Sequence, residues 1–138
     1  MKKLIVIASC SSLLLSACKK EAGEGGNSSL SGKVTKDVRV VLTNPSTRTG
    51  TFPAADQDVF IIYGDDISPG DRIQTNYDGE YEFRYLRPGK YTIYTFSRDT
   101  NSVSVSWDEE HMTILREVEI SEKKQDVTVD EMKIYDTE

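Results

Sequence analysis

Residues 75–97, TNYDGEYEFRYLRPGKYTIYTFS, constrain the fold of this chain most strongly, because turn signals and strand alternation coincide there. Asp78 and Gly79 form a tight-turn pair, since glycine adopts positive φ at no steric cost. Pro88 and Gly89 have the order typical of a type II turn. Large apolar side chains recur at every second position around these turns, at Tyr81, Phe83, Tyr85, Tyr91 and Ile93. The stretch therefore predicts consecutive strands whose alternating apolar side chains face one core.

Other short segments show similar strand patterns. They are residues 30–34, 38–42, 57–63, 72–76, 114–120 and 127–134. Residues 44–55, rich in Pro, Gly, Ser and Thr, read as a long loop. Met132 and Ile134 reach the core only if a bulge near residues 130–131 changes the parity of the last segment. No segment has a helical period over ten residues or more, and about seven short strands predict an antiparallel Greek-key β-sandwich.

The N-terminal segment has a different character. Lys2 and Lys3 precede an apolar run at residues 4–15, and small residues lead to Cys18. This pattern resembles a bacterial lipoprotein signal with its lipobox, although an ordinary secretory signal shares its first two parts. The resemblance implies cleavage after residue 17 and acylation of Cys18, with palmitate among the attached chains, and hence a membrane partner through the lipid.

Three parts of the chain follow from this interpretation: a signal peptide at residues 1–17, a flexible Gly/Ser-rich tether at residues 18–29, and one domain at residues 30–138. The only other cysteine, Cys10, would leave with the signal, so we expect no intrachain disulfide. We expect a lipoprotein of the Gram-negative outer membrane, with the periplasmic or surface face left open.

Two motifs carry a second resemblance. D-G-x-Y-x-F stands at residues 78–83 and L-x-P-G-x-Y at residues 86–91. Together with Ser31-Gly32-Lys33-Val34 and Asp58-Val59-Phe60-Ile61, they resemble the carboxypeptidase regulatory-like family. The resemblance implies a transthyretin-like (prealbumin-like) sandwich. Members of that family serve as accessory or binding modules, so the fold by itself implies no single activity.

Charge and histidine content narrow the function. The chain has 17 basic and 23 acidic residues, and loss of the signal would remove two lysines and no acids. This acidic balance argues against nucleic acid as a partner, since phosphate contacts need a basic footprint. His111 is the only histidine, and no nucleophile motif accompanies it, so we predict no enzymatic activity and no cofactor.

The alternation also places apolar side chains away from the core. If the strands at residues 57–63 and 90–97 are neighbours, Phe60, Ile62, Tyr94 and Phe96 share the outer face of one sheet. Such a face indicates a contact surface for a protein or a glycan, unless the loop at residues 44–55 or 98–112 covers it. Trp107, beside acidic residues, is a separate candidate for stacking on a sugar ring.

We predict no metal site, although four residues carry oxygen atoms of the kind that bind calcium. Asp65, Asp66, Asn76 and Asp78 offer oxygen ligands, provided that their two loops meet at one end of the sandwich. The alternative is that Asp78 caps its own turn. We therefore expect a non-enzymatic accessory module that binds an envelope protein, with a carbohydrate-binding module at the cell surface as the alternative.

Overall fold

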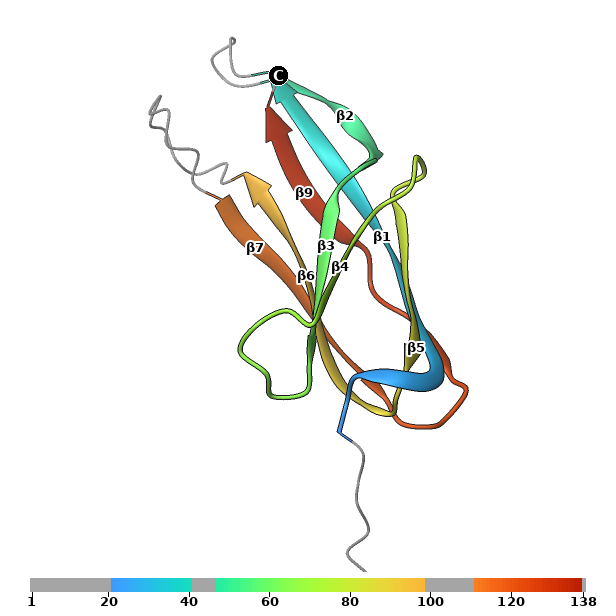
Figure 1. Cartoon of the computed structure of the whole chain (residues 1–138). Helices are drawn as coiled ribbons and strands as arrows, with labels where there is room; N and C mark the ends of the chain where they lie inside the picture. The colour runs from blue at the N-terminus through green and yellow to red at the C-terminus, as the bar shows by residue number, and fades with distance from the viewer. Residues whose placement is uncertain (1–20, 41–46, 99–110, 138) are drawn as a thin grey trace, which may run out of the picture.

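The computed structural model describes residues 21–40, 47–98 and 111–137 (Figure 1). Within these ranges the regular structure consists of β-strands, and none of the described residues forms a helix long and apolar enough to cross a membrane. The nine strands are β1 (Glu24–Val40), β2 (Thr47–Pro53), β3 (Asp58–Tyr63), β4 (Asp71–Gln74), β5 (Glu80–Leu86), β6 (Gly89–Arg98), β7 (His111–Ile120), β8 (Asp126–Thr128) and β9 (Met132–Thr137).

The strands form two sheets. One is antiparallel with the order β4-β3-β6-β7. The other is built on the long strand β1, which pairs antiparallel with β5 and β2 but parallel with β8 and β9 (Figure 1). The predicted all-β sandwich is confirmed. It contains more strands than predicted, and its two parallel pairings depart from a purely antiparallel design.

The core lies between the two sheets, where the alternating side chains of both meet. It contains Leu30, Val34, Val59, Ile61, Tyr81, Phe83, Tyr91, Ile93, Ile120 and Met132, each at most 4% exposed. Fully burying one such aliphatic side chain contributes about 1.5–3 kcal/mol. The predicted inward positions in β3, β6 and the first part of β5 are therefore confirmed.

Tyr85 is an exception, and its predicted inward position is wrong. It has a φ of 60° and is 71% exposed, while Leu86 takes the buried position. The register between β1 and β5 changes here, because Leu30 lies opposite Phe83 but Ser28 lies opposite Leu86. One extra residue on β5 therefore forms a β-bulge that turns Tyr85 outward.

The predicted tether is also corrected by the structure. β1 begins at Glu24, so the folded part starts well before residue 30. Ser28 is only 2% exposed, and its hydroxyl accepts a hydrogen bond from the Gln125 N–H at 3.1 Å. Gly26 lies so close to β5 that a Cβ would approach the Leu86 carbonyl oxygen. Small residues here permit close strand pairing, although the same composition is typical of linkers.

Two further segments differ from their predicted roles. Part of the expected loop at residues 44–55 is the edge strand β2, which pairs with β1 from Thr35 to Val40. Met132 and Ile134 are buried as predicted, but the parity changes through a break between β8 and β9. Both segments depend on pairing with β1, a long-range contact that local alternation does not report.

Candidate functional site

The outer face of the β4-β3-β6-β7 sheet carries a cluster of aromatic side chains. Phe60 on β3 lies directly opposite Tyr94 on β6, and their rings stack with centroids 5.0 Å apart and an interplanar angle of 13°. Phe96 contacts both rings edge-on, at 5.6 Å from Phe60 and 5.7 Å from Tyr94. This mutual packing leaves Phe60 and Tyr94 half-buried and Phe96 41% exposed. The predicted shared outer face is thus present.

The cluster continues across the neighbouring strands. Tyr94 lies opposite Leu115 on β7, which is 50% exposed, and Phe60 lies opposite Arg72 on β4. Ile62 follows on β3 beside Thr92. We call Phe60, Ile62, Tyr94, Phe96 and Leu115 the aromatic patch. It spans three adjacent strands, with Arg72 at one margin.

Leu115 was not singled out by the sequence reasoning, although a signal for it exists. Ile114, Val118 and Ile120 alternate toward the core, with Ile120 1% exposed. The residue between two inward positions of a strand must face outward. Once β7 is known to be the neighbour of β6, Leu115 necessarily joins the patch.

The second sheet has a different outer surface. Its exposed side chains include the charged Lys33, Glu80, Glu82, Arg84 and Lys133, together with the aromatic Phe52 and Tyr85. Arg84 and Glu82 form an ion pair on this surface. Among the described residues, the rings that pack against one another on an outer face are those of Phe60, Tyr94 and Phe96.

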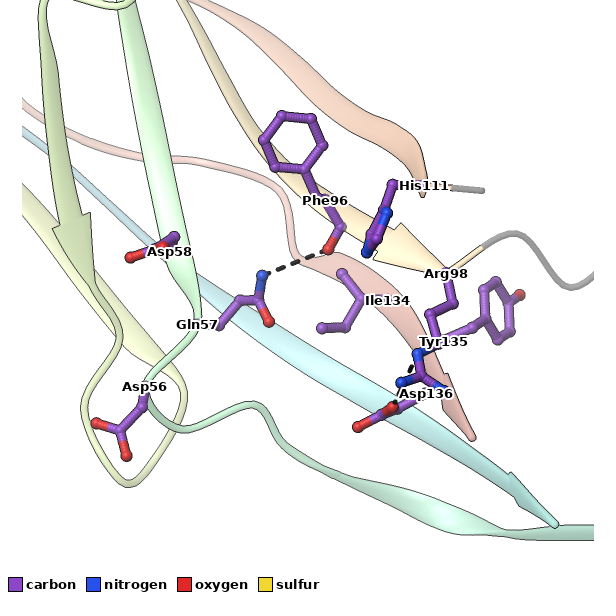
Figure 2. A pocket seen from close by; sticks show the side chains of 9 residues that line it. All are labelled: Asp56, Gln57, Asp58, Phe96, Arg98, His111, Ile134, Tyr135 and Asp136. Carbon is purple, nitrogen blue, oxygen red and sulfur yellow. Dashed lines mark hydrogen bonds and ion pairs between the residues drawn. The ribbon is translucent and has the colours of Figure 1, made fainter. Parts of the chain in front are cut away.

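A groove adjoins the patch at Phe96 (Figure 2). It has a volume of about 570 Å³ and is lined by Asp56, Gln57, Asp58, Phe96, Arg98, His111, Ile134, Tyr135 and Asp136. The amide of Gln57 donates to the Thr95 hydroxyl at 2.9 Å and reaches the Phe96 carbonyl at 3.4 Å. Arg98 lies 3.6 Å from a carboxylate oxygen of Asp136. The groove thus combines the aromatic residues Phe96 and Tyr135 with several hydrogen-bonding groups.

The two loops considered as covers of the patch are only partly described. β2 belongs to the β1 sheet and pairs with Thr35 to Val40, so this part of the predicted 44–55 loop lies in the other layer. Residues 99–110, including Trp107, lie outside the described residues. The glycan-stacking hypothesis for Trp107 therefore stays a prediction.

The calcium hypothesis required two loops to meet, and they do not. Asp65 and Asp66 lie in the segment before β4, whereas Asn76 and Asp78 lie in the turn after it, so the pairs occupy opposite ends of that strand. Among the described residues no group of three or more His, Cys, Asp or Glu side chains is placed to hold a metal ion. The four oxygen donors therefore do not form one site.

Asn76, rather than Asp78, organises the turn that precedes β5. Its side-chain oxygen accepts hydrogen bonds from the backbone N–H groups of Asp78 at 3.0 Å and Glu80 at 2.9 Å. Gly79 follows with a φ of 76°, which favours glycine. The Asn76 oxygen is already used within the turn, and the predicted capping role of Asp78 is corrected accordingly.

Tyr63, the last residue of β3, and Tyr91, near the start of β6, have raised pKa values. Burial and the nearby Glu24 and Asp71 carboxylates raise the pKa of Tyr63 to about 12. Burial also raises the pKa of Tyr91, whose hydroxyl hydrogen-bonds with the Gly23 and Arg87 backbones. Both phenols stay protonated at neutral pH and serve here as hydrogen-bonding and packing groups.

No protein-family model matches the chain, and no curated protein is found to match it. The resemblance to the carboxypeptidase regulatory-like family therefore stays a prediction. The fold itself defines the class of protein: an all-β sandwich of two sheets with an aromatic patch on one outer face.

Solved structures similar to this chain are found at low identity. A Pseudomonas aeruginosa protein described as a candidate carbohydrate-binding protein is 12% identical, with a TM-score of 0.46, and the match covers 79% of this chain and 91% of that one. An (S)-allantoin synthase is 14% identical, with a TM-score of 0.41. That match covers 83% of this chain but only 43% of the synthase. Similarities this distant carry no argument about function.

Proposed function

We propose that this chain is a lipid-anchored envelope lipoprotein that acts without catalysis, binding another envelope protein through the aromatic patch. The anchor is the lipid on Cys18, which the basic, apolar and small-residue pattern before that cysteine supports. The observation that carries the interaction is the packed cluster of Phe60, Tyr94 and Phe96 on an outer sheet face.

The composition of the patch fits a protein partner. Phenylalanine and tyrosine offer large apolar area with few rotatable bonds, and aromatic residues are enriched in interface centres. Charged side chains stand beside the apolar centre: Arg72 and Asp58 form an ion pair at 3.6 Å on one side, and Glu117 is exposed on β7. An apolar centre with a charged margin is the arrangement typical of specific protein interfaces.

Site-specific crosslinking tests the interaction in the native envelope. A photo-crosslinking amino acid at Leu115 places the reactive group on the patch, and the same group at Glu82 places it on the charged face of the other sheet. We expect one defined protein to crosslink from position 115 and not from position 82. Phe60→Ser combined with Phe96→Ser should abolish that product. Equal products from both positions, or products unaffected by the double substitution, would refute the proposal.

Two controls keep this experiment interpretable. Circular dichroism and thermal unfolding of the double variant show whether the sandwich still folds, and Leu115→Lys provides a milder change at an exposed position. Cys18→Ser separately tests the anchor, because it should remove lipid labelling and release the protein from the membrane fraction.

Carbohydrate binding is the second candidate, favoured by the groove beside Phe96. Its aromatic ring and neighbouring amide, imidazole and carboxylate groups are the types that stack on and hydrogen-bond to sugars. Titration with envelope oligosaccharides discriminates the two functions. Binding that survives Phe60→Ser, a residue outside the groove, but disappears in Phe96→Ser would favour carbohydrate binding in the groove. Trp107→Ala tests the separate stacking hypothesis for that residue.

A further inference from the structure

The chain enters the sandwich at one defined end, which we call the entry end. It is formed by residues 21–23, the β3–β4 loop at residues 64–70, the turn before β6, and the turn after β7. These segments line one hollow through residues that include Ala22, Gly64, Asp65, Arg87, Pro88, Ser121 and Lys123. In Figure 1 the blue start of β1 and the green loop after β3 both lie at this end of the molecule.

The start of the folded part is firmly attached to the entry end. The Gly23 N–H donates to the Tyr91 hydroxyl at 3.0 Å, and the Gly23 carbonyl accepts from the Arg87 N–H at 2.9 Å. Ala22 packs against the hydrophobic core. The fold therefore begins at Ala22, and the chain available as a tether is much shorter than the predicted residues 18–29.

This shorter tether limits the distance between the fold and a lipid on Cys18. Four residue steps separate Cys18 from Ala22, and a fully extended chain spans at most about 14 Å over four steps. The ten-residue strand β6 is about 33 Å long at the usual rise per residue. An anchor at Cys18 thus keeps the entry end near the bilayer, while the opposite end can stand a strand length away.

One side chain at the entry end is apolar and completely open. Ile67, in the loop between β3 and β4, is 100% exposed. The loop is held at its base, because the Asp66 N–H donates to the Tyr63 carbonyl at 3.0 Å and the Gly70 N–H donates to the Ile61 carbonyl at 2.9 Å. Ile67 is therefore presented on a braced loop at the end that the anchor brings to the membrane.

The charges at the entry end indicate the kind of lipid surface that fits. Both signs of charge line the hollow: Arg87, Lys90 and Lys123 are basic, and Glu21, Asp65, Asp66 and Glu119 are acidic. A surface with both signs suits zwitterionic head groups, which carry an ammonium and a phosphate, and gives no net attraction to an anionic layer.

We infer that the entry end is a membrane-contact surface, with Ile67 entering the head-group region of the zwitterionic bilayer that holds the Cys18 lipid. The inference rests on the proposed lipid anchor. It orients the molecule with its strands directed away from the bilayer. The groove beside Phe96, at the opposite end of β6 from Gly89, then faces away from the membrane.

Fluorescence quenching by lipid-attached nitroxides tests this orientation. The mature lipidated protein would have no free cysteine, because Cys10 leaves with the signal and Cys18 carries lipid. Single cysteines are introduced by Ile67→Cys at the entry end, by Tyr77→Cys in the turn before β5, and by Leu115→Cys on the aromatic patch. Tyr77 is a matched control, since it is 88% exposed and lies beyond the other end of β4.

Each single cysteine is labelled with a fluorophore, and the protein is placed in phosphatidylcholine vesicles that contain the nitroxide lipid. We expect the fluorophore at position 67 to be quenched several-fold more strongly than the one at position 77 or 115. Equal quenching at 67 and 77, or the strongest quenching at 115, would overturn the inference. A Gly/Ser insertion between Lys20 and Glu21, as long as the predicted tether at residues 18–29, should weaken quenching at position 67. Unchanged quenching in that variant would also overturn the inference. Mass analysis of Cys18 separates the two proposals, because an unlipidated Cys18 refutes both and a lipidated Cys18 with an unfavourable quenching pattern refutes only this one.

Discussion

The Tyr91 hydroxyl accepts a hydrogen bond from the Gly23 N–H at 3.0 Å, joining β6 to a residue 68 positions earlier in the chain. The same hydroxyl donates to the Arg87 carbonyl at 2.6 Å. One phenol thus joins the start of the fold to the turn that precedes β6. These two hydrogen bonds attach the polar, glycine-rich segment that contains Gly23 to the sandwich.

Removing this hydroxyl should loosen the start of the fold. We expect Tyr91→Phe to lower the free energy of unfolding by about 1–3 kcal/mol, because it leaves a buried N–H without its acceptor. Hydrogen exchange should accelerate at Gly23 and its neighbours more than in β3. Tyr63→Phe is the matched control, since its hydroxyl makes one exposed bond to Glu24 at 3.3 Å, and an effect as large as that of Tyr91→Phe would contradict the assignment.

Adding a methyl group at Gly26 should separate β1 from β5. A Cβ there would stand 1.9 Å from the Leu86 carbonyl oxygen, which is closer than two unbonded atoms can approach, so the backbone has to move. We expect Gly26→Ala to destabilise the protein by at least about 2 kcal/mol, as measured by urea unfolding. Asn27→Ala, at the adjacent exposed position, should have little effect. Equal stability of the two variants would show that this part of β1 does not pair closely with β5.

Replacing Asn76 should weaken the turn before β5. Asn76→Ala removes the acceptor for the Asp78 and Glu80 N–H groups, so we expect a loss of about 1–2 kcal/mol in the free energy of unfolding. Asp78→Ala should be close to neutral. The reverse order of the two effects in thermal unfolding would restore the interpretation in which Asp78 caps the turn.

Stability should fall at alkaline pH because of Tyr63. Its pKa is raised from 10.0 to about 12 in the folded state, so the folded protein binds more protons than the unfolded chain between these values. The stabilisation is complete below pH 10 and is lost as the pH rises toward 12. Urea unfolding across this range checks the slope, and Tyr63→Phe should reduce it. An unchanged slope in that variant would assign the effect to other groups.

Local alternation predicted the parts of the fold that have one buried and one exposed face. In β3, Val59 and Ile61 are buried while Phe60 and Ile62 face outward, as the period of two requires. The aromatic patch was predictable for the same reason, on the single condition that β3 and β6 are neighbours. Leu115 could be added only when the place of β7 in the sheet was known.

Elsewhere the decisive interactions were not local. Tyr85 faces outward because a bulge with positive φ interrupts β5, and no glycine stands at or next to this position to signal it. Residues 24–29 resemble a linker in composition, yet they pair with β5 and β8 because small side chains allow close approach. The split of the calcium ligands likewise follows from the position of β4 between the two loops.

The parallel pairing of β1 with β9 has a mechanical consequence. Their hydrogen-bonded register runs from Val34 beside Met132 to Arg39 beside Thr137. A pull between the proposed membrane anchor and the end of β9 would draw these strands past each other lengthwise, so the bonds between them would carry the load together in shear. Strands peeled apart from one end break one bond at a time. A protein held at the bilayer and pulled at its far end would therefore resist tension along the direction in which its strands are strongest.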